Sequence, residues 1–480
     1  MNLQDLTKED IFKYFNEISK ISRCSHREDK IADYLEQFAK THKLVYLRDK
    51  ENNLIIKRDI GSKPTVALQA HVDMVCIKTN DSIHDFSKDS ISLQLNKSLL
   101  SAKNTTLGAD NGIGVAYMLA LLADANYEGP NLECIFTTNE EDGMTGANNL
   151  DISNLNSQYL LNLDSEEEGK LYVSSAGGVV CNLLIPIKYK LRDGYIYSVK
   201  IFGLKGGHSG LEIDKKRGNA IKQAARILNY LQEESIAFRL IEIDGGKKHN
   251  AIPEEIAMKI LLKNKDQFEA LDALINNCQN IFQKELRHQD PDVKVTLTYL
   301  SKGMINTLSK STTITLIGVL NLLPDGVIKM SEEIPQLVET SANVGKVIQE
   351  KDILKITTSL RSSKDENLDS LIEMFNQLKT AFNLQFTTEY SYPGWAYDKN
   401  SVLKEIAKEV YNNLFNEKLE EIAIHAGLEC GFFKNKKADL DIISFGPNIN
   451  KIHTIDESVD INSVRKVYAF LNTLLNSLDS

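Results

Sequence analysis

Five short apolar runs along the chain predict buried strands, because each has the length of a strand and most are rich in Val, Ile, Leu or Phe. The runs cover residues 53–57, 65–70, 131–138, 159–163 and 441–445. Segments with helical spacing separate them, and Ile31, Leu35 and Phe38 mark one such helix. Strands that alternate with helices indicate a mostly parallel sheet, which binds its ligands outside the carboxyl ends of its strands.

Two shorter patterns predict local structure. Ser25 and Glu28 have the spacing of a capping box, so we expect them to cap the helix that follows. Three glycines between residues 108 and 114 predict a tight turn, and the apolar residues 115–123 predict a helix directly after it. This turn presents Asp110 at a fixed place. The glycine spacing is neither that of a dinucleotide-binding loop nor that of a P-loop, and alone it indicates an ordinary turn.

The pattern changes between about residues 186 and 390, where apolar and polar positions alternate as in half-exposed strands. The predicted strands cover residues 195–202, 238–243, 255–262, 293–299 and 353–360, and the predicted helices cover residues 219–233, 266–286 and 366–381. We therefore expect an α+β domain of residues 187–390, inserted into a sheet domain formed by residues 1–186 and 391–480.

Composition narrows the possible partners of the chain. Its 480 residues exceed one ordinary core, and 42% hydrophobic with 25% charged residues is typical of a globular protein. A net charge of −10 argues against nucleic acid or an anionic membrane as a partner. The start lacks the pattern of a signal peptide, and no apolar run approaches the ~20 residues that span a bilayer.

Cysteine usage points to a reducing compartment. The six cysteines include no C-x-x-C pair. They are Cys24, Cys76, Cys134, Cys181, Cys278 and Cys430. We expect reduced thiols and a cytoplasmic protein.

Acids and histidines gather at the ends of the predicted strands. They are His71, Asp73, Asp110, Glu140, Glu141, Asp164 and His453. Each has an ordinary explanation alone, but if these ends share one edge of the sheet, five acids and two imidazoles converge. Such a cluster would repel itself without a cation, and two divalent metals bridged by one carboxylate would resolve the repulsion. Imidazole with carboxylate suits zinc, with cobalt or manganese as possible substitutes.

Several motifs resemble those of the M20 group of dinuclear zinc peptidases, and most closely its aminoacyl-histidine dipeptidase branch. The matching segments are residues 71–73, 106–114, 138–147, 162–169, 203–210, 217–220, 250–253 and 425–431, together with His453. The resemblance covers nearly the whole chain. It implies a catalytic α/β domain with an inserted lid domain, two Zn²⁺ per subunit, a small peptide substrate and a homodimer.

Carried over by position, the resemblance assigns roles to single residues. Asp110 would bridge the two metals; one would also bind His71 and Asp164, and the other Glu141 and His453. Asp73 would orient His71. Glu140 would be the general base toward the bridging water and would later return the proton to the leaving amine. His208 would reach the partner's site and stabilise the oxyanion.

Three further residues are expected to bind substrate: Arg361, His425 and Glu429. Arg361 would pair with the terminal carboxylate of the peptide, although a surface arginine on a strand explains it equally well. Two positions depart from the family pattern, because His249 stands where an arginine is expected and Asn139 where an acid is common. Both could alter substrate preference.

Two alternatives to dipeptide hydrolysis remain open at this point. The same metal ligands would serve a tripeptidase or an N-acyl amino-acid hydrolase. A non-catalytic scaffold could also keep the metal-binding fold, but the retention of Glu140, which ligates nothing in this scheme, counts against it.

Overall fold

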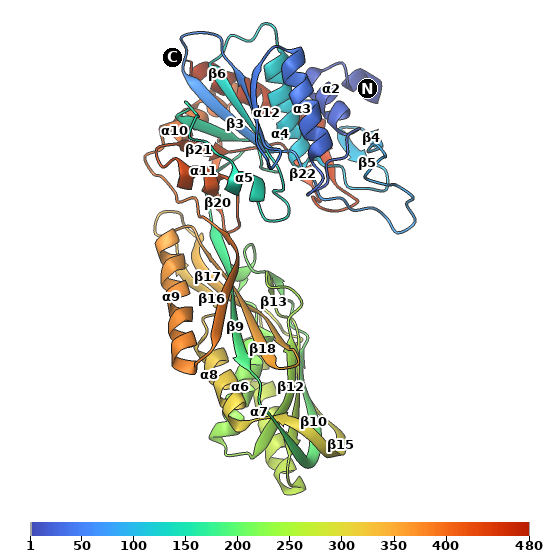
Figure 1. Ribbon diagram of the computed structural model, residues 1–480, viewed down its shortest axis with the longest axis vertical. Coiled ribbons are helices and arrows are strands. Elements are labelled where there is room, and N and C mark those ends of the chain that lie inside the picture. Colours follow the sequence, from blue (N-terminus) through green and yellow to red (C-terminus); the bar gives the residue numbers. More distant parts are fainter. Residues whose placement is uncertain (1, 480) are drawn as a thin grey trace. The chain divides into compact units, whose positions relative to one another are not determined.

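The computed structural model describes residues 2–479, and the chain divides into two compact units (Figure 1). The first unit comprises Met1–Ser175, Trp395–Ala423 and Leu428–Ser480. The second comprises Ala176–Gly394 and Ile424–Gly427. It thus contains the predicted inserted domain and extends past it on both sides. No helix within residues 2–479 has the length and apolar character needed to cross a bilayer.

An eight-stranded sheet forms the centre of the first unit, in the order β1-β2-β6-β3-β7-β21-β8-β20. The strands are β1 (Val45–Arg48), β2 (Leu54–Arg58), β3 (Thr65–His71), β6 (Asn131–Thr137), β7 (Tyr159–Asn162), β8 (Lys170–Ser175), β20 (Glu420–Ile424) and β21 (Asp441–Ser444). The predicted α/β class is confirmed, and the central strands β6, β3, β7 and β21 pair in parallel. The pairings of β1 with β2, β2 with β6 and β21 with β8 are antiparallel, which the apolar pattern did not indicate.

The helices of this unit bury apolar faces. They are α1 (Leu3–Leu6), α2 (Asp10–Ile18), α3 (Asp29–Thr41), α4 (Ala109–Ala123), α5 (Thr145–Asn149), α10 (Val402–Phe415), α11 (Cys430–Lys436) and α12 (Ile461–Ser477). Helix α4 is buried along almost its whole length, which fixes the turn at its N-terminus in the interior. A small sheet joins β4 (Leu93–Asn96), β5 (Leu99–Ala102), β22 (Ile449–Asn450) and β23 (Ser458–Asp460).

The second unit is built on a nine-stranded sheet, in the order β15-β10-β14-β12-β17-β18-β9-β19 with β16 beside β17. Its strands are β9 (Gly177–Pro186), β10 (Tyr189–Phe202), β12 (Phe238–Gly245), β14 (Ile256–Leu262), β15 (Lys294–Leu308), β16 (Gly326–Met330), β17 (Val338–Gln349), β18 (Ile353–Ser362) and β19 (Gln385–Tyr392). A separate short pair joins β11 (Gly207–His208) to β13 (Ala251–Ile252). Two 3-10 turns, η1 (Ile213–Lys215) and η2 (Lys265–Gln267), complete the unit.

Four helices pack against one face of this second sheet. They are α6 (Ala220–Glu233), α7 (Phe268–Glu285), α8 (Lys310–Leu322) and α9 (Asp365–Phe382). All four contribute to one apolar core, which also takes alternate residues of β9 such as Cys181 and Leu183. Because side chains alternate along a strand, Asn182 points to the opposite face. Around Asn182, that helix-free face is polar, with Thr357 and Lys346 on the neighbouring strands.

The predicted capping box is wrong. Ser25 and Glu28 do not form a capping box, because α3 begins at Asp29 without a side-chain cap. Instead, Ser25 Oγ donates to Asp73 Oδ2 at 2.8 Å, and Glu28 Oε1 accepts the backbone N–H groups of His26 and Asn139. The contacts with Asp73 and Asn139 join residues far apart in the sequence, so a local pattern could not reveal them.

The cysteines are also not all reduced. Cys24 and Cys76 form a disulfide, with a sequence separation of 52 residues and a Cα–Cα distance of 5.7 Å. A parallel bridge between Cys24 and Met74 brings the two segments together. The other four cysteines are free thiols and are buried.

Candidate metal centre

The register of three parallel strands gathers the predicted ligands at one edge of the first sheet. His71 ends β3 and lies opposite Thr137 of β6, so Glu140 and Glu141 follow on the adjacent loop. On the other side of β3, Gln69 lies opposite Asn162 of β7, which places Asp164 just beyond the same edge. Parallel strands bring their carboxyl ends together, as the sequence argument required.

Asp110 reaches this edge from the start of α4. Gly108, the residue that caps the helix, has φ 70°, a conformation that suits glycine. A Cβ atom there would lie 2.4 Å from Nη2 of Arg23 and 2.7 Å from Sδ of Met74, so the turn also has no room for a side chain. The three-glycine stretch is therefore a turn whose shape is set by close packing.

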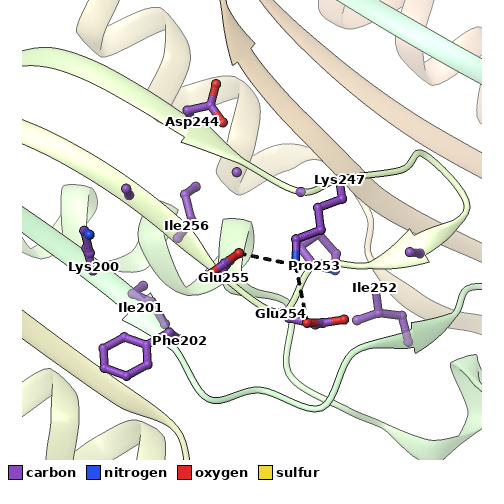
Figure 2. A pocket seen from close by; sticks show the side chains of 14 residues that line it. Lys200, Ile201, Phe202, Asp244, Lys247, Ile252, Pro253, Glu254, Glu255 and Ile256 are labelled. Carbon is purple, nitrogen blue, oxygen red and sulfur yellow. Dashed lines mark ion pairs between the residues drawn. The ribbon is translucent and has the colours of Figure 1, made fainter.

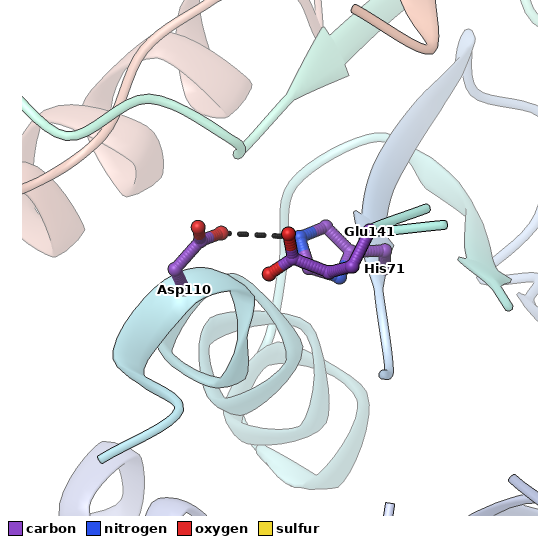
Figure 3. A group of neighbouring side chains, drawn as sticks. All are labelled: His71, Asp110 and Glu141. Atoms are coloured by element: carbon purple, nitrogen blue, oxygen red, sulfur yellow. Dashed lines mark hydrogen bonds and ion pairs between the residues drawn. The ribbon is translucent and has the colours of Figure 1, made fainter. Parts of the chain in front are cut away.

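The two carboxylate oxygens of Asp110 face different imidazoles. Oδ1 lies 3.1 Å from His71 Nε2 (Figure 3). Oδ2 lies 3.2 Å from His453 Nε2. His71 Nε2 is also 3.4 Å from Asp164 Oδ1, and His453 Nε2 is 2.8 Å from Glu141 Oε2. The geometry thus forms two groups of donor atoms with Asp110 between them.

These donors form a set that suits divalent cations. One ligand atom each from His71, Asp110 and Glu141 lies within 4.8 Å of the others. The carboxylates of Asp110, Glu141 and Asp164 are buried, while the side chain of His453 is 44% exposed. Three buried carboxylates within reach of two imidazoles would be costly without positive charge.

Charge coupling within the cluster is strong. Burial raises the pKa of Glu141 and of Asp164. Hydrogen bonds to Asp110 and Glu141 raise the pKa of His453 to about 11. Burial opposes protonation of His71, yet the charge of Asp164 and hydrogen bonds to the surrounding carboxylates hold its pKa well above the usual value.

Asp73 connects the two sides of the centre. Its side chain is fully buried, and Oδ1 lies 3.4 Å from His71 Nδ1. The same carboxylate accepts the backbone N–H groups of Glu140 and Glu141 at 3.0 and 3.3 Å. It therefore fixes the ring of His71 and the loop that carries the two glutamates.

Glu140 differs from its neighbour in its contacts. Within residues 2–479, its carboxylate accepts no hydrogen bond, whereas Glu141 contacts His453. Burial raises the pKa of Glu140 well above its usual value.

The chain is similar to known peptidases over its whole length. A cytosol non-specific dipeptidase of Escherichia coli is 36% identical to the chain over 482 residues, which cover 99% of each protein. The chain belongs to the M20 peptidase family. The model of the M20 peptidase dimerisation domain matches residues 199–290.

Solved structures agree with this assignment. The aminoacylhistidine dipeptidase of Vibrio alginolyticus superposes with a TM-score of 0.92, at 33% identity over 99% of this chain and 98% of that one. A tripeptidase of Staphylococcus aureus superposes with a TM-score of 0.55 at 15% identity, covering 98% of both chains, and shares the fold alone.

Two charged residues that the sequence analysis missed hold the turn of Asp110 in this M20 peptidase. Arg23, which is 2% exposed, donates to the carbonyl oxygens of Val72, Asp73 and Gly108. Glu457 accepts the backbone N–H groups of Leu107, Gly108 and Ala109 at 2.8, 3.0 and 2.8 Å. An isolated charge in a loop carries no periodic signal, although Glu457 lies only four positions after His453.

Glu429, which we expected to bind substrate, lies inside the first unit. Its Oε2 accepts Gln69 Nε2 at 2.6 Å and Thr137 Oγ1 at 2.7 Å, and its side chain is fully buried. Burial raises the pKa of Glu429 to about 8. Both hydrogen bonds come from strand residues, one of β3 and one of β6. The role of Glu429 toward substrate stays a prediction.

Three other residues with predicted roles lie together in the second unit: His208, Arg361 and His425. Burial lowers the pKa of His208 and lowers that of His425 to about 3, and the nearby Arg361 guanidinium lowers both further. Arg361 Nη1 donates to the hydroxyl of Tyr392 at 2.8 Å, and His425 Nε2 lies 2.7 Å from Ser341 Oγ. The second unit thus carries a cationic group beside two neutral imidazoles.

Proposed function

We propose that this chain is a metal-dependent dipeptidase that hydrolyses small dipeptides. The single observation that carries the proposal is the position of Asp110, whose two oxygens each face a separate histidine–carboxylate pair. Full-length similarity to a dipeptidase supports it. The chain is accordingly a peptide-bond hydrolase of the M20 family.

The donor set fits two zinc ions. His71 and Asp164 would hold one ion, Glu141 and His453 the other, with Asp110 shared between them. Bound zinc would lower the pKa of a water molecule and polarise the carbonyl of the scissile bond. Cobalt or manganese would be accepted by the same imidazole and carboxylate groups.

Glu140 is the proposed general base. Its carboxylate has no hydrogen-bond partner within the described residues, so both oxygens are available to a water molecule. The hydrogen bond from its own backbone N–H to Asp73 positions the residue beside the ligands without making it one. Glu140 would take the proton from the attacking water and return it to the leaving amine.

His208 is the proposed oxyanion donor, supplied across a homodimer. Its Nδ1 accepts the backbone N–H groups of Gly210 and Leu211 at 3.2 and 3.1 Å. An accepting Nδ1 places the proton of a neutral ring on Nε2, which is then free to donate. The match of residues 199–290 to a peptidase dimerisation domain supports a dimer in which each site uses the partner subunit's His208.

A substrate panel with metal removal tests the proposed function. The purified protein is assayed on dipeptides, tripeptides and N-acyl amino acids, then treated with chelator and reloaded with zinc. We expect dipeptides to be cleaved, activity and thermal stability to fall together on chelation, and both to return with zinc. Cleavage of only tripeptides or acylated substrates would assign the site to that reaction instead. Two bound metals with no cleavage of any substrate would indicate a scaffold.

We also infer that the protein works in the cytoplasm, as the name of the E. coli relative states for that enzyme. The Cys24–Cys76 disulfide is uncommon in that compartment, so the inference needs its own test. Recovery with a cytosolic marker on cell fractionation would support it, and recovery in an exported fraction would contradict it.

A further inference from the structure

The helix-free face of the second sheet carries a cavity whose lining contains no proposed metal ligand, general base or oxyanion donor. It has a volume of about 470 Å³, within the range of small-molecule sites. Strands β9, β17, β18 and β19 line it, together with the loop before β13. Its lining is basic, in contrast to the net charge of −10 for the whole chain.

The floor of this cavity is a row of three residues on neighbouring strands. Lys346 of β17 lies opposite Thr357 of β18, and Thr357 lies opposite Asn182 of β9. Thr357 Oγ1 donates to Asn182 Oδ1 at 2.8 Å. The amide nitrogen of Asn182 has no hydrogen-bond partner within residues 2–479, although the side chain is 0% exposed. A buried donor without a partner is costly, and it indicates a missing acceptor.

One wall is built by strained backbone. Tyr390 has φ 51°, which is uncommon for a bulky residue, and it lies in a bulge of β19 between Glu389 and Tyr392. The bulge turns the Tyr390 ring onto His249, with 5.7 Å between centroids and 7° between planes. Strain of this kind is typical of ligand sites.

The charges of the lining leave a net excess of about two positive units. Lys247 is neutralised, because it lies between Glu254 and Glu255 at 3.9 and 3.4 Å on the side of a second cavity of about 500 Å³ (Figure 2). Burial lowers the pKa of His249, so its ring is neutral near pH 7. Three lysines then remain against one acid, which is Glu389, 3.7 Å from Lys355. The lysines are Lys248, Lys346 and Lys355.

We propose that this cavity binds a phosphate dianion, free or as the phosphate group of a small metabolite. A phosphate group carries between about −1.5 and −2 at pH 7 and offers several strong acceptor oxygens. One oxygen would accept the orphaned N–H of Asn182, and the lysines would neutralise the charge. Every residue that lines it belongs to the second unit, and none of them is a proposed metal ligand.

Calorimetric titration of the zinc-loaded full-length protein with inorganic phosphate, against chloride at equal ionic strength, tests this site. The wild type should show saturable binding. Asn182→Asp keeps the acceptor for Thr357 but replaces the free donor by a negative charge, so binding should be lost. Lys346→Gln should weaken binding at least tenfold, which corresponds to about 1.4 kcal/mol. Glu389→Gln should tighten it.

A matched control removes the same charge elsewhere. Lys190→Gln lies on β10 of the same unit, outside the cavity, and should leave the affinity unchanged. If Asn182→Asp fails to fold, the opposite shifts expected for Lys346→Gln and Glu389→Gln still decide the question. Absence of saturable binding in the wild type, or equal affinity in all variants, would overturn the proposal; the latter would place phosphate elsewhere, for example on the zinc ions. Titration of a sugar phosphate beside inorganic phosphate distinguishes the two sources.

Discussion

Arg23 donates a hydrogen bond to the carbonyl oxygen of Gly108, the residue that caps the turn of Asp110. The carboxylate of Glu457 accepts three backbone N–H groups of the same turn. Two oppositely charged side chains, from segments more than four hundred residues apart, therefore fix one short loop. Asp110 can face both histidines only while this loop keeps its shape.

The first prediction is that Glu457→Gln weakens metal binding without removing a ligand. The neutral amide can accept at one atom only, so all three backbone N–H groups lose a charged partner and at least one loses its acceptor, at about 1–3 kcal/mol. We expect about 10–100-fold weaker zinc affinity by competition with a chelating dye. Glu128→Gln, an exposed acid of the same unit, should match the wild type. Unchanged affinity in Glu457→Gln would show that the turn holds without it.

The second prediction separates Glu140 from Glu141. Glu140→Gln keeps size and hydrogen bonding but cannot accept a proton, so turnover should fall by roughly 10²–10⁴ while two metals stay bound. Glu141→Gln should lose metal, because Glu141 contacts His453 within the proposed second ion site. Elemental analysis of both variants checks this, and the reverse pattern would exchange the two roles.

The third prediction concerns subunit complementation. His208→Ala and Glu140→Gln should each be inactive, yet a heterodimer would contain one site with both residues intact. Half of the dimers are mixed after equal exchange, so about a quarter of wild-type activity should return. Differently tagged chains confirm the exchange. If exchange is complete and activity stays absent, His208 acts in its own subunit or not in catalysis.

The fourth prediction is a pH-dependent stability term from His425. Burial lowers its pKa to about 3 in the folded protein, against 6.5 ordinarily. Between pH 3 and 6.5, His425 therefore binds a proton in the unfolded chain but not in the folded chain. The contribution of His425 to the free energy of unfolding is fully present above pH 6.5 and is lost as the pH falls toward 3. The loss is on the order of 3–5 kcal/mol.

Chemical denaturation between pH 4 and 7.5 measures this term. His425→Gln should flatten the dependence, whereas His288→Gln, which removes an exposed imidazole, should keep the wild-type slope. Equal slopes for the wild type and His425→Gln would show that His425 is protonated in the folded protein.

The sequence predicted those residues of the metal centre that lie directly after the carboxyl ends of strands. Apolar runs placed β3, β6 and β7 within one or two residues of their bounds, so the convergence of His71, Glu141 and Asp164 could be foreseen. In contrast, Arg23 and Ser25 act through contacts with residues about fifty positions away or more, and their neighbours in sequence give no hint of them.

Other features were missed for different physical reasons. Helix α8 reads Lys-Ser-Thr-Thr-Ile-Thr-Leu-Ile, and β-branched residues of this kind favour strands, so its helical form depends on tertiary packing. The Cys24–Cys76 pair depends on a single bridge between distant segments. Such long-range constraints are fixed only when the chain is folded.

The register between His71 and Thr137 limits how this chain can vary in length. Side chains alternate along a strand, so inserting one residue within β3 would turn His71 to the wrong face, and inserting one within β6 would shift the loop that carries Glu141. The connection between β3 and α4 contains the β4–β5 hairpin, which carries no ligand; β5 pairs with β23, but Lys97 in the hairpin turn is exposed. Natural insertions and engineered fusions should therefore be tolerated at Lys97 and Ser98, in the turn of that hairpin, and be absent from the seven-residue strands β3 and β6.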